Sequence, residues 1–396
     1  MIQISPETQL FIREHSSDDV RALALQAKKY PDINMPTAIT QIAGRQVAAE
    51  KIPSWREIEE IWYPKHLSLE QCSSEITARY KARLFQGDSL IDLTGGFGID
   101  CSFLATGFKT ATYVERQEEL CEIAAHNFPI LNLNHINIKN EDGVTYLQAM
   151  SPVDCLFLDP ARRNEHGGKT VAISDCEPNV AELEELLLQK ANRVMIKLSP
   201  MLDLSLALKE LKQTQEVHIL SVNNECKELL ILLGQTSPTE ISIHCVNLST
   251  KGTQEEQHFV FTREQEQCSE CTYTDSLETY LYEPNASLLK AGAFRSIAAA
   301  YPVRKLHPNS HLYTSDTFIE NFPGRIFRIV NQCSFNKKEV KENLADLKKA
   351  NVTVRNFPAT VAELRKRIHL AEGGDTYLFA STLNNGQKVL IRCEKV

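Results

Sequence analysis

The amino-acid sequence predicts an α/β fold in which five parallel strands close with an antiparallel hairpin, between an N-terminal helical region and C-terminal α+β modules. Two observations predict it. From about residue 88 to 235, short apolar runs alternate with stretches of helical spacing, which is typical of a parallel sheet covered by helices. The last two apolar runs, Val217–Val222 and Leu229–Leu233, are separated by only six residues. That is too few for the crossover that a parallel pair requires.

Residues 1–85 are expected to form an N-terminal helical domain. Asp18–Tyr30 and Thr37–Glu50 place apolar side chains at helical spacing, and further helices are expected at Trp55–Trp62 and Ser73–Phe85. Proline residues stand between these segments, where helices commonly begin or end.

The alternating region, residues 86–237, is expected to form one domain. Its expected strands are Leu90–Leu93, Ala111–Val114, Ile136–Ile138, Cys155–Leu158, Val194–Leu198, Val217–Val222 and Leu229–Leu233. Its expected helices are Glu118–Asn127, Val180–Lys190 and Leu204–Thr214.

Beyond residue 237 the pattern changes to α+β. A connecting domain is expected over residues 238–322, with strands at Ile241–Val246 and His258–Thr262. The final domain, residues 323–396, alternates strands and helices and ends in a hairpin that turns at Asn384–Gly386. Its expected strands are Arg325–Asn331, Val352–Arg355, Thr376–Thr382 and Lys388–Cys393, and its helices are Lys337–Ala350 and Thr360–His369.

Composition restricts the class of protein. Hydrophobic residues make up 42% of the chain and charged residues 24%, as in globular proteins. No apolar run approaches the roughly 18 residues of a membrane span, and the N-terminus lacks the pattern of a secretory signal. Eleven scattered cysteines fit reduced thiols in the cytoplasm better than a disulfide framework. The lone Cys268–Cys271 pair has no partner pair, so no metal site is expected.

Charge is divided unevenly along the chain. Residues 321–396 carry 14 lysines and arginines against 7 aspartates and glutamates, whereas residues 1–320 carry 29 against 44. A basic C-terminal module beside an acidic body indicates contact with a polyanion, although solvated helix faces can give the same count.

The most informative stretch follows the first expected strand, which ends in Asp92. A glycine-rich turn comes next and opens a helix. The turn contains Thr94, Gly95, Gly96 and Gly98. Glycine lets the backbone pass close to a ligand, and a helix N-terminus offers free N–H donors. The dinucleotide pattern GxGxxG is broken at Cys101, and no Walker A loop is present. A tight turn without a ligand would also explain the glycines alone.

Acidic residues end the following strands in the same way. Glu115 ends the second strand, where a carboxylate can accept hydrogen bonds from both hydroxyls of a ribose. Asp142 and Gly143 follow the third strand, where an adenine would lie. Asp159 and Pro160 follow the fourth strand. Because the carboxyl ends of parallel strands meet at the edge where open α/β sheets bind ligands, we expect the acidic groups to lie along one edge.

With these residues in view, the sequence over roughly 75–235 resembles a class I S-adenosylmethionine-dependent methyltransferase, a Rossmann-like fold with a seven-stranded sheet. Asp92–Gly98 matches the family's first motif. It is similar to the D-P-x-C-G-x-G form found in RNA methyltransferases with THUMP domains, with Leu93 replacing proline and Gly95 replacing cysteine. The whole chain further resembles a bacterial family with a ferredoxin-like insert and a C-terminal THUMP-like domain.

The resemblance implies S-adenosylmethionine as cofactor and assigns roles to the strand-end residues. Glu115 would hold the cofactor's ribose, and Asp142 with Gly143 would hold its adenine. The Thr94–Gly98 loop would hold the methionine end. Asp92 would orient that loop or meet the cofactor's ammonium group.

Asp159-Pro160-Ala161-Arg162 resembles the family's fourth motif, which reads Asp/Asn-Pro-Pro-Tyr/Phe in enzymes that methylate base nitrogens. The predicted catalytic residues are therefore Asp159, Pro160 and Arg162. Arg162 would replace the aromatic ring by stacking on a base or pairing with phosphate. Uridine C5-methyltransferases have Asp-Pro-Pro-Arg but need a cysteine nucleophile after the fifth strand, where this chain has Lys197–Pro200. Direct in-line transfer to nitrogen or oxygen is the better prediction, and a base nitrogen the leading acceptor.

The C-terminal domain is predicted to bind RNA, because its THUMP-like resemblance favours structured transfer or ribosomal RNA. Basic side chains on its two expected helices would contact phosphates. They are Lys337, Lys338, Arg365, Lys366 and Arg367. Neither DNA nor a membrane is expected as a partner.

Two other function classes stay open beside an RNA methyltransferase. A non-catalytic RNA-binding protein could retain the methyltransferase fold, and it would form no S-adenosylhomocysteine in the presence of RNA. A methyltransferase acting on a protein or small molecule would leave the basic module without a purpose, and it would not bind RNA at physiological salt.

Overall fold

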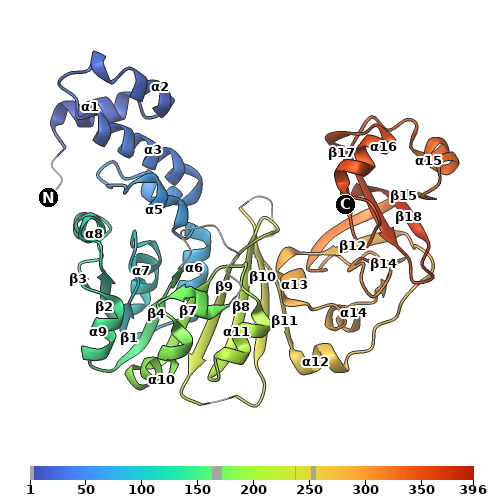
Figure 1. Cartoon of the computed structure of the whole chain (residues 1–396). Coiled ribbons are helices and arrows are strands. Elements are labelled where there is room, and N and C mark those ends of the chain that lie inside the picture. The colour runs from blue at the N-terminus through green and yellow to red at the C-terminus, as the bar shows by residue number, and fades with distance from the viewer. Residues whose placement is uncertain (1–3, 163–171, 237, 251–255) are drawn as a thin grey trace. The chain divides into compact units, whose positions relative to one another are not determined.

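A computed structural model describes residues 4–162, 172–236, 238–250 and 256–396 of the chain (Figure 1). The chain divides into two compact units. The first comprises Met1–Gln215 and Leu229–Pro238, and the second comprises Glu216–Glu228 and Thr239–Val396. All eleven cysteines carry free thiols. Within the described ranges, no helix is both long and apolar enough to cross a membrane.

The N-terminal region is helical, as predicted, apart from one segment. Its helices are α1 (Pro6–Glu14), α2 (Val20–Leu25), α3 (Met35–Lys51), α4 (Pro53–Arg56), α5 (His66–Gln71) and α6 (Glu75–Leu84), drawn in blue in Figure 1. The helix predicted over Trp55–Trp62 is wrong, because α4 ends at Arg56. The backbone N–H and carbonyl of Trp62 instead pair with the Asn127 side chain, each at 2.9 Å. This long-range contact replaces the helical hydrogen bonds that the apolar spacing predicted.

The first sheet has the strand order β11-β10-β8-β9-β7-β4-β1-β2-β3. Its strands are β1 (Gly87–Asp92), β2 (Phe108–Glu115), β3 (Ile136–Asn140), β4 (Val153–Leu158), β7 (Ala191–Leu198), β8 (Thr214–Val222), β9 (Glu225–Gly234), β10 (Ser242–Leu248) and β11 (Glu256–Thr262). The seven predicted strands are all present. Two more extend the sheet, because β10 pairs in parallel with β8 and β11 pairs antiparallel with β10. The predicted count of seven is therefore too low, while the predicted α/β class is confirmed.

The predicted hairpin is formed by β8 and β9. Asn223 and Asn224 make the two-residue turn between these strands, and both have positive φ, 50° and 67°. Two successive positive φ angles define the type I′ turn that joins antiparallel strands. Strand β9 also runs antiparallel to β7. The hairpin thus follows the five parallel strands β3, β2, β1, β4 and β7.

Helices and short elements connect the strands of this sheet. The helices are α7 (Ile99–Leu104), α8 (Glu118–Ile130), α9 (Gly143–Ala149), α10 (Val180–Lys190) and α11 (Leu204–Glu210). The short elements are η2 (Ala105–Gly107), η3 (Ile173–Asp175), β5 (Ala161–Arg162) and β6 (Cys176–Glu177), while a further short helix, η1 (Ala27–Lys29), lies in the N-terminal region. Apolar side chains of the central parallel strands, such as Tyr113 on β2 and Phe157 on β4, are almost completely buried. A continuous apolar core therefore supports the strand ends that carry the predicted site.

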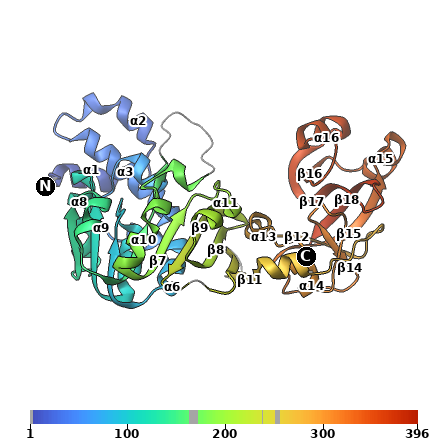
Figure 2. The ribbon, with the colours of Figure 1, turned by 60° about the horizontal axis from the view of Figure 1, so that its bottom comes forward.

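A second sheet belongs to the second unit and has the order β13-β14-β12-β15-β18-β17-β16 (Figures 1 and 2, orange to red). Its strands are β12 (Tyr280–Pro284), β13 (Arg304–Lys305), β14 (Tyr313–Ser315), β15 (Gly324–Ser334), β16 (Lys349–Val354), β17 (Ala371–Thr382) and β18 (Lys388–Lys395). The helices in this part of the chain are α12 (Arg263–Cys268), α13 (Ala286–Ala291), α14 (Ser296–Ala300), α15 (Lys337–Leu344) and α16 (Val361–Ile368). The strands between residues 238 and 322 are thus shared between the two sheets. The four-domain division stays a prediction.

One buried ion cluster joins strands of the second sheet. The carboxylate of Glu283 on β12 is only 2% exposed, and it contacts Arg325 on β15. The same carboxylate lies 3.1 Å from Nη2 of Arg355. Beside this cluster, Leu281 and Phe327 are completely buried in one apolar core.

Candidate functional site

The glycine-rich turn between β1 and α7 is closely packed against its neighbours. A Cβ atom on Gly95 would lie 2.3 Å from the ring of Tyr113. A Cβ atom on Gly143, the first residue of α9, would lie 2.2 Å from the carbonyl oxygen of Leu93. Gly98 precedes α7 with φ +86°, a conformation that favours glycine. These positions need glycine so that the ends of β1, β2 and α9 can approach one another.

Glu115 holds this turn at the end of β2. Its Oε2 accepts a hydrogen bond from the backbone N–H of Gly96 at 2.9 Å, and its Oε1 accepts one from Gln117 at 2.8 Å. Glu115 is only 8% exposed. An ionised carboxylate has about four acceptor positions. Two positions therefore remain for the hydroxyls of a ribose, which is the role predicted for this residue.

Asp142 caps the N-terminus of α9. Its Oδ1 accepts hydrogen bonds from the backbone N–H groups of Val144 and Thr145, at 3.1 and 2.9 Å. This is the usual arrangement of an acidic N-cap, and it uses only one of the two carboxylate oxygens. The predicted contact of Asp142 with adenine stays a prediction.

Asp92 and Asp159 come together at the ends of the neighbouring strands β1 and β4. The hydroxyl oxygen of Thr94 accepts a hydrogen bond from the backbone N–H of Asp159 at 2.6 Å. The backbone N–H of Thr94 donates to Oδ1 of Asp92 at 3.0 Å. A single threonine therefore links the predicted cofactor loop to the predicted catalytic motif.

Asp92 is a buried acid whose surroundings disfavour its ionised form. Only 1% of the residue is exposed, and its Oδ2 has no hydrogen-bond partner within the described part of the chain. Burial is the main cause that raises the pKa of Asp92 to about 8. The hydrogen bond from Thr94 and the ammonium group of Lys197 oppose this rise, whereas the carboxylates of Asp100 and Asp159 contribute to it. A cationic group placed at Oδ2 would stabilise the ionised form.

A buried ion cluster connects β4, β7, α6 and α7 beside this acid. Nζ of Lys81 lies 2.9 Å from Oδ1 of Asp100. Nζ of Lys197 lies 3.2 Å from Oδ2 of Asp100 and 2.6 Å from Oδ2 of Asp159. The hydroxyl of Ser73 donates to Asp100 at 2.7 Å and accepts from both ammonium groups. Two lysines and two carboxylates thus balance their charges.

The pKa values of the two carboxylates in this cluster are shifted in opposite directions. Burial alone would raise the pKa of Asp100, but the ammonium groups of Lys81 and Lys197 outweigh it and hold that pKa well below its usual range. Desolvation raises the pKa of Asp159 despite its contact with Lys197. Because 36% of the Asp159 side chain is exposed, solvent reduces this effect of burial. Asp159 is the member of the cluster that a substrate can reach.

The ion cluster was not predicted from the sequence. In the sequence, Lys197 belongs to a segment that lacks a cysteine nucleophile, and it interrupts the apolar run Val194–Leu198. A central parallel strand is buried on both faces, so a lysine within it requires a charged partner. That interruption is the signal that could have identified Lys197. Lys81, which is completely buried on α6, carries no comparable signal in its polar helix.

The remaining residues of the fourth motif lie at the margin of the described structure. Pro160 follows Asp159 at the end of β4, and Ala161 pairs with Glu177 in a short two-stranded ribbon. The Arg162 side chain lies outside the described residues, so its predicted contact with a base or phosphate stays a prediction.

The N-terminal region contacts the glycine-rich turn through Phe97. This ring is 4% exposed and packs edge-on against Trp55, with ring centroids 5.3 Å apart. The ring of Tyr63 also contacts it, with ring centroids 6.1 Å apart. The helices before β1 therefore support the predicted cofactor loop from outside the sheet.

The predicted RNA-binding residues differ in how far they reach solvent. Lys337, Lys338 and Lys366 are exposed on α15 and α16. Arg367 is also exposed, with its guanidinium 4.1 Å from the centre of the Phe335 ring. Arg365 differs, because only 18% of its side chain is exposed and it donates to the carbonyl of Ala350 at 3.3 Å. The first four can meet a polyanion, whereas Arg365 has a packing contact.

Family models match most of the second unit. A ferredoxin-like domain matches residues 280–323, and a THUMP domain-like model matches residues 324–395. No curated protein matches the sequence. The crystal structure of a proposed methyltransferase from Porphyromonas gingivalis W83 is 34% identical, covers 100% of both chains and superposes with a TM-score of 0.87.

Two smaller solved structures match part of the chain. A proposed methyltransferase from Streptococcus mutans, in complex with S-adenosylhomocysteine, is 14% identical over 40% of this chain and 96% of its own, with a TM-score of 0.30. An rRNA methylase from Streptococcus thermophilus is 14% identical over 40% of this chain and 93% of its own, with a TM-score of 0.29. Both similarities are too distant to bear on function. The full-length similarity to the P. gingivalis protein and the two matched domains establish the family: the chain belongs, with that protein, to the methyltransferase family that carries a ferredoxin-like domain and a C-terminal THUMP-like domain.

Proposed function

We propose that this protein transfers a methyl group from S-adenosylmethionine to RNA. The observation that carries the proposal is the Thr94 bridge, which places the acid of the fourth motif, Asp159, directly beside the glycine-rich turn held by Glu115. A donor bound at that turn and an acceptor bound at Asp159 would be neighbours. Such positioning is most of what an enzyme contributes when the donor is already reactive.

The residues at the strand ends fit this cofactor. Glu115 has two acceptor positions for ribose hydroxyls, and the glycines of the turn let the backbone pass close to a ligand. Oδ2 of Asp92, which has no hydrogen-bond partner among the described residues, would receive the ammonium of the methionine moiety. When bound, S-adenosylmethionine supplies a methyl group on a positively charged sulfur. The chain itself has to align the acceptor and exclude water.

A base nitrogen is the acceptor predicted from the fourth motif. In that case the Asp159 carboxylate would accept a hydrogen bond from the nitrogen and so orient its lone pair. Lys197 occupies one carboxylate oxygen of Asp159, and the other oxygen remains for the substrate.

A hydroxyl oxygen is a second candidate acceptor, and the contact of Lys197 with Asp159 favours it. A hydroxyl gains negative charge as it loses its proton, and a buried ammonium group stabilises that charge. The Asp159 carboxylate, beside it at 2.6 Å, would accept the proton. A base nitrogen develops no negative charge during attack, so it would gain little from the ammonium.

RNA is proposed as the substrate because of the THUMP domain-like match and the exposed basic residues on α15 and α16. Phosphate contacts by lysine and arginine supply affinity without sequence choice.

The proposal is tested by incubating tag-free protein with labelled S-adenosylmethionine and RNA from a bacterial strain lacking the protein. Asp159→Asn serves as the control. We expect the unchanged protein to transfer label to RNA and the Asp159→Asn variant to transfer none. Analysis of the labelled nucleosides then distinguishes base methylation from ribose methylation. RNA binding without S-adenosylhomocysteine formation would indicate a non-catalytic binder. Methylation of protein or small molecules, without affinity for RNA, would indicate a methyltransferase that acts on one of those substrates.

A further inference from the structure

A cluster of histidines lies on one face of the first sheet, far along the chain from the glycine-rich turn. Glu216 and His218 are two residues apart on β8, so their side chains project to the same face. His244 on β10 is the direct register partner of His218. His258 on β11 is paired across from Val246, which shares the face of His244. All four residues belong to the second unit.

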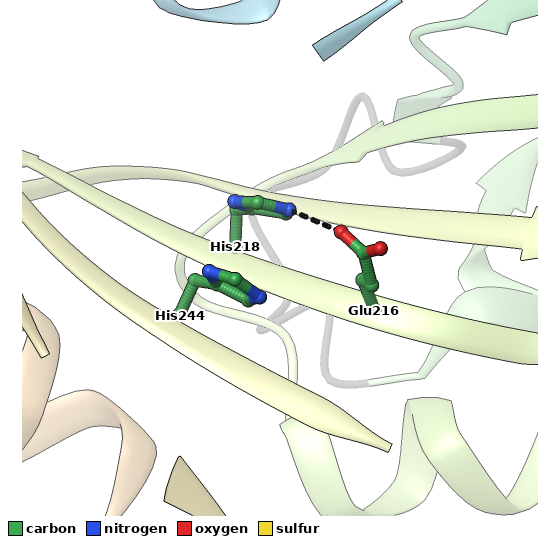
Figure 3. Close-up of side chains that lie close together, drawn as sticks. All are labelled: Glu216, His218 and His244. Atoms are coloured by element: carbon green, nitrogen blue, oxygen red, sulfur yellow. Dashed lines mark hydrogen bonds and ion pairs between the residues drawn. The ribbon is translucent and has the colours of Figure 1, made fainter. Parts of the chain in front are cut away.

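The donor atoms of three of these side chains converge. One atom from each of Glu216, His218 and His244 lies within 4.8 Å of the others. Nε2 of His218 lies 3.2 Å from Oε2 of Glu216. That separation is close to the ligand–ligand distance of about 3.3 Å that tetrahedral coordination with 2.0–2.1 Å bonds requires. Figure 3 shows the imidazoles of His218 and His244 one above the other, beside the carboxylate.

The surroundings fix the two imidazoles in place. His218 is 2% exposed, and its ring stacks on that of His244 with centroids 4.3 Å apart and an interplanar angle of 19°. Nδ1 of His244 lies 3.1 Å from Nε2 of His258. In the tautomer in which Nδ1 donates to His258, Nε2 of His244 carries the lone pair. A metal-bound histidine characteristically donates its other N–H to a neighbouring acceptor in this way.

The third side chain of the group is less constrained than the two imidazoles. The Glu216 side chain is 41% exposed, so it can adjust its position on the solvent side while the two histidines stay fixed.

We propose that Glu216, His218 and His244 bind a zinc ion, with His258 as the outer partner of His244. Two imidazoles and one carboxylate are the donor set that zinc accepts, whereas magnesium and calcium prefer oxygen ligands. Three protein ligands leave a fourth position for water. The site lies on the three strands β8, β10 and β11, and the ion would bridge β8 to β10. It is independent of the proposed methyl transfer.

The test is calorimetric titration of tag-free, full-length protein with zinc chloride. One equivalent is expected to bind, with affinity at least 100-fold weaker in His244→Ala and about 10-fold weaker in His258→Gln, since an outer partner contributes less than a ligand. His126→Gln, a histidine of the first unit, is the control and should not change the affinity. Cobalt in place of zinc should give the strong visible absorption of a tetrahedral ion.

Glu216→Gln keeps the shape of the side chain but removes its charge, and circular dichroism checks that each variant is folded. A folded Glu216→Gln protein that binds zinc at least 10-fold more weakly supports the site. The proposal would be overturned if the protein bound no stoichiometric zinc. It would also be overturned if His244→Ala bound zinc as strongly as the control His126→Gln.

Discussion

The ammonium nitrogen of Lys197 lies 2.6 Å from a carboxylate oxygen of Asp159, at the ends of the neighbouring strands β7 and β4. Lys197 is almost fully buried, whereas Asp159 is partly open to solvent. The contact joins the predicted acceptor-orienting acid to a charge cluster inside the fold. Changes in that cluster should therefore affect both stability and activity.

Replacing Lys197 with methionine should destabilise the protein strongly. Loss of one partner leaves the carboxylates of Asp100 and Asp159 under-compensated, at a cost of about 3–5 kcal/mol in the free energy of unfolding. Urea denaturation measures this cost. Lys65→Met is the matched control, because Lys65 forms an exposed pair with Glu119 and should cost at most about 1 kcal/mol. Equal losses in the two variants would contradict the prediction.

The raised pKa of Asp92 should make stability decline as the pH rises. Its folded-state pKa is about 8 and its reference value is 3.8. The folded protein therefore keeps a proton that the unfolded chain has released. This contribution is complete below about pH 4, and it is lost at up to about 1.4 kcal/mol per pH unit until about pH 8. In Asp92→Asn this part of the pH dependence should disappear. The free energies of unfolding of both proteins, measured at pH 6 and pH 8, test this prediction. An equal change between the two pH values in both proteins would refute it.

Glu115→Ala should abolish binding of S-adenosylmethionine in calorimetry, because it removes the proposed ribose acceptor and the bond to Gly96. Glu115→Gln retains one acceptor oxygen and should bind at least 10-fold more weakly than the unchanged protein. Glu119→Gln, on the exposed face of α8, is the control and should bind normally. Retained affinity in Glu115→Ala would exclude the ribose assignment.

Replacing the exposed pair Lys337 and Lys338 with alanine should weaken RNA binding and reduce its salt dependence. Each lost phosphate contact lowers the slope of log affinity against log salt by about 0.7–0.9. Fluorescence anisotropy at several salt concentrations measures this slope. The control is a double alanine variant of Lys28 and Lys29, which lie in the N-terminal region. A slope unchanged in the first variant would exclude α15 as an RNA contact.

The alternation of strands and helices could be predicted because it follows from local patterns. Apolar runs of strand length identified β1 to β4 and β7 to β9, and a six-residue gap identified the hairpin. The attachment of β10 and β11 to the same sheet was not visible. Pairing with the edge strand β8 depends on tertiary contacts, and sequence distance alone indicated a separate module.

The candidate site was predictable only in part, for the same physical reason. Asp92, Glu115 and Asp159 each end a strand, and the strand order brings them to one edge. The charges that surround Asp159 come from α6, α7 and β7, whose convergence has no periodic signature. The zinc ligands likewise depend on the register of β8 with β10.

The ferredoxin-like and THUMP domain-like regions share one sheet, since β12 pairs with β15 and Glu283 contacts both Arg325 and Arg355. A protein shortened to end at residue 323 would expose the hydrogen-bonding edge of β12 that pairs with β15. It would also leave the Glu283 carboxylate without its two arginine partners. Open edges promote aggregation. If a protein without residues 324–396 failed to bind RNA, the cause could be aggregation as well as the loss of RNA contacts. Substitutions of exposed basic residues avoid this ambiguity.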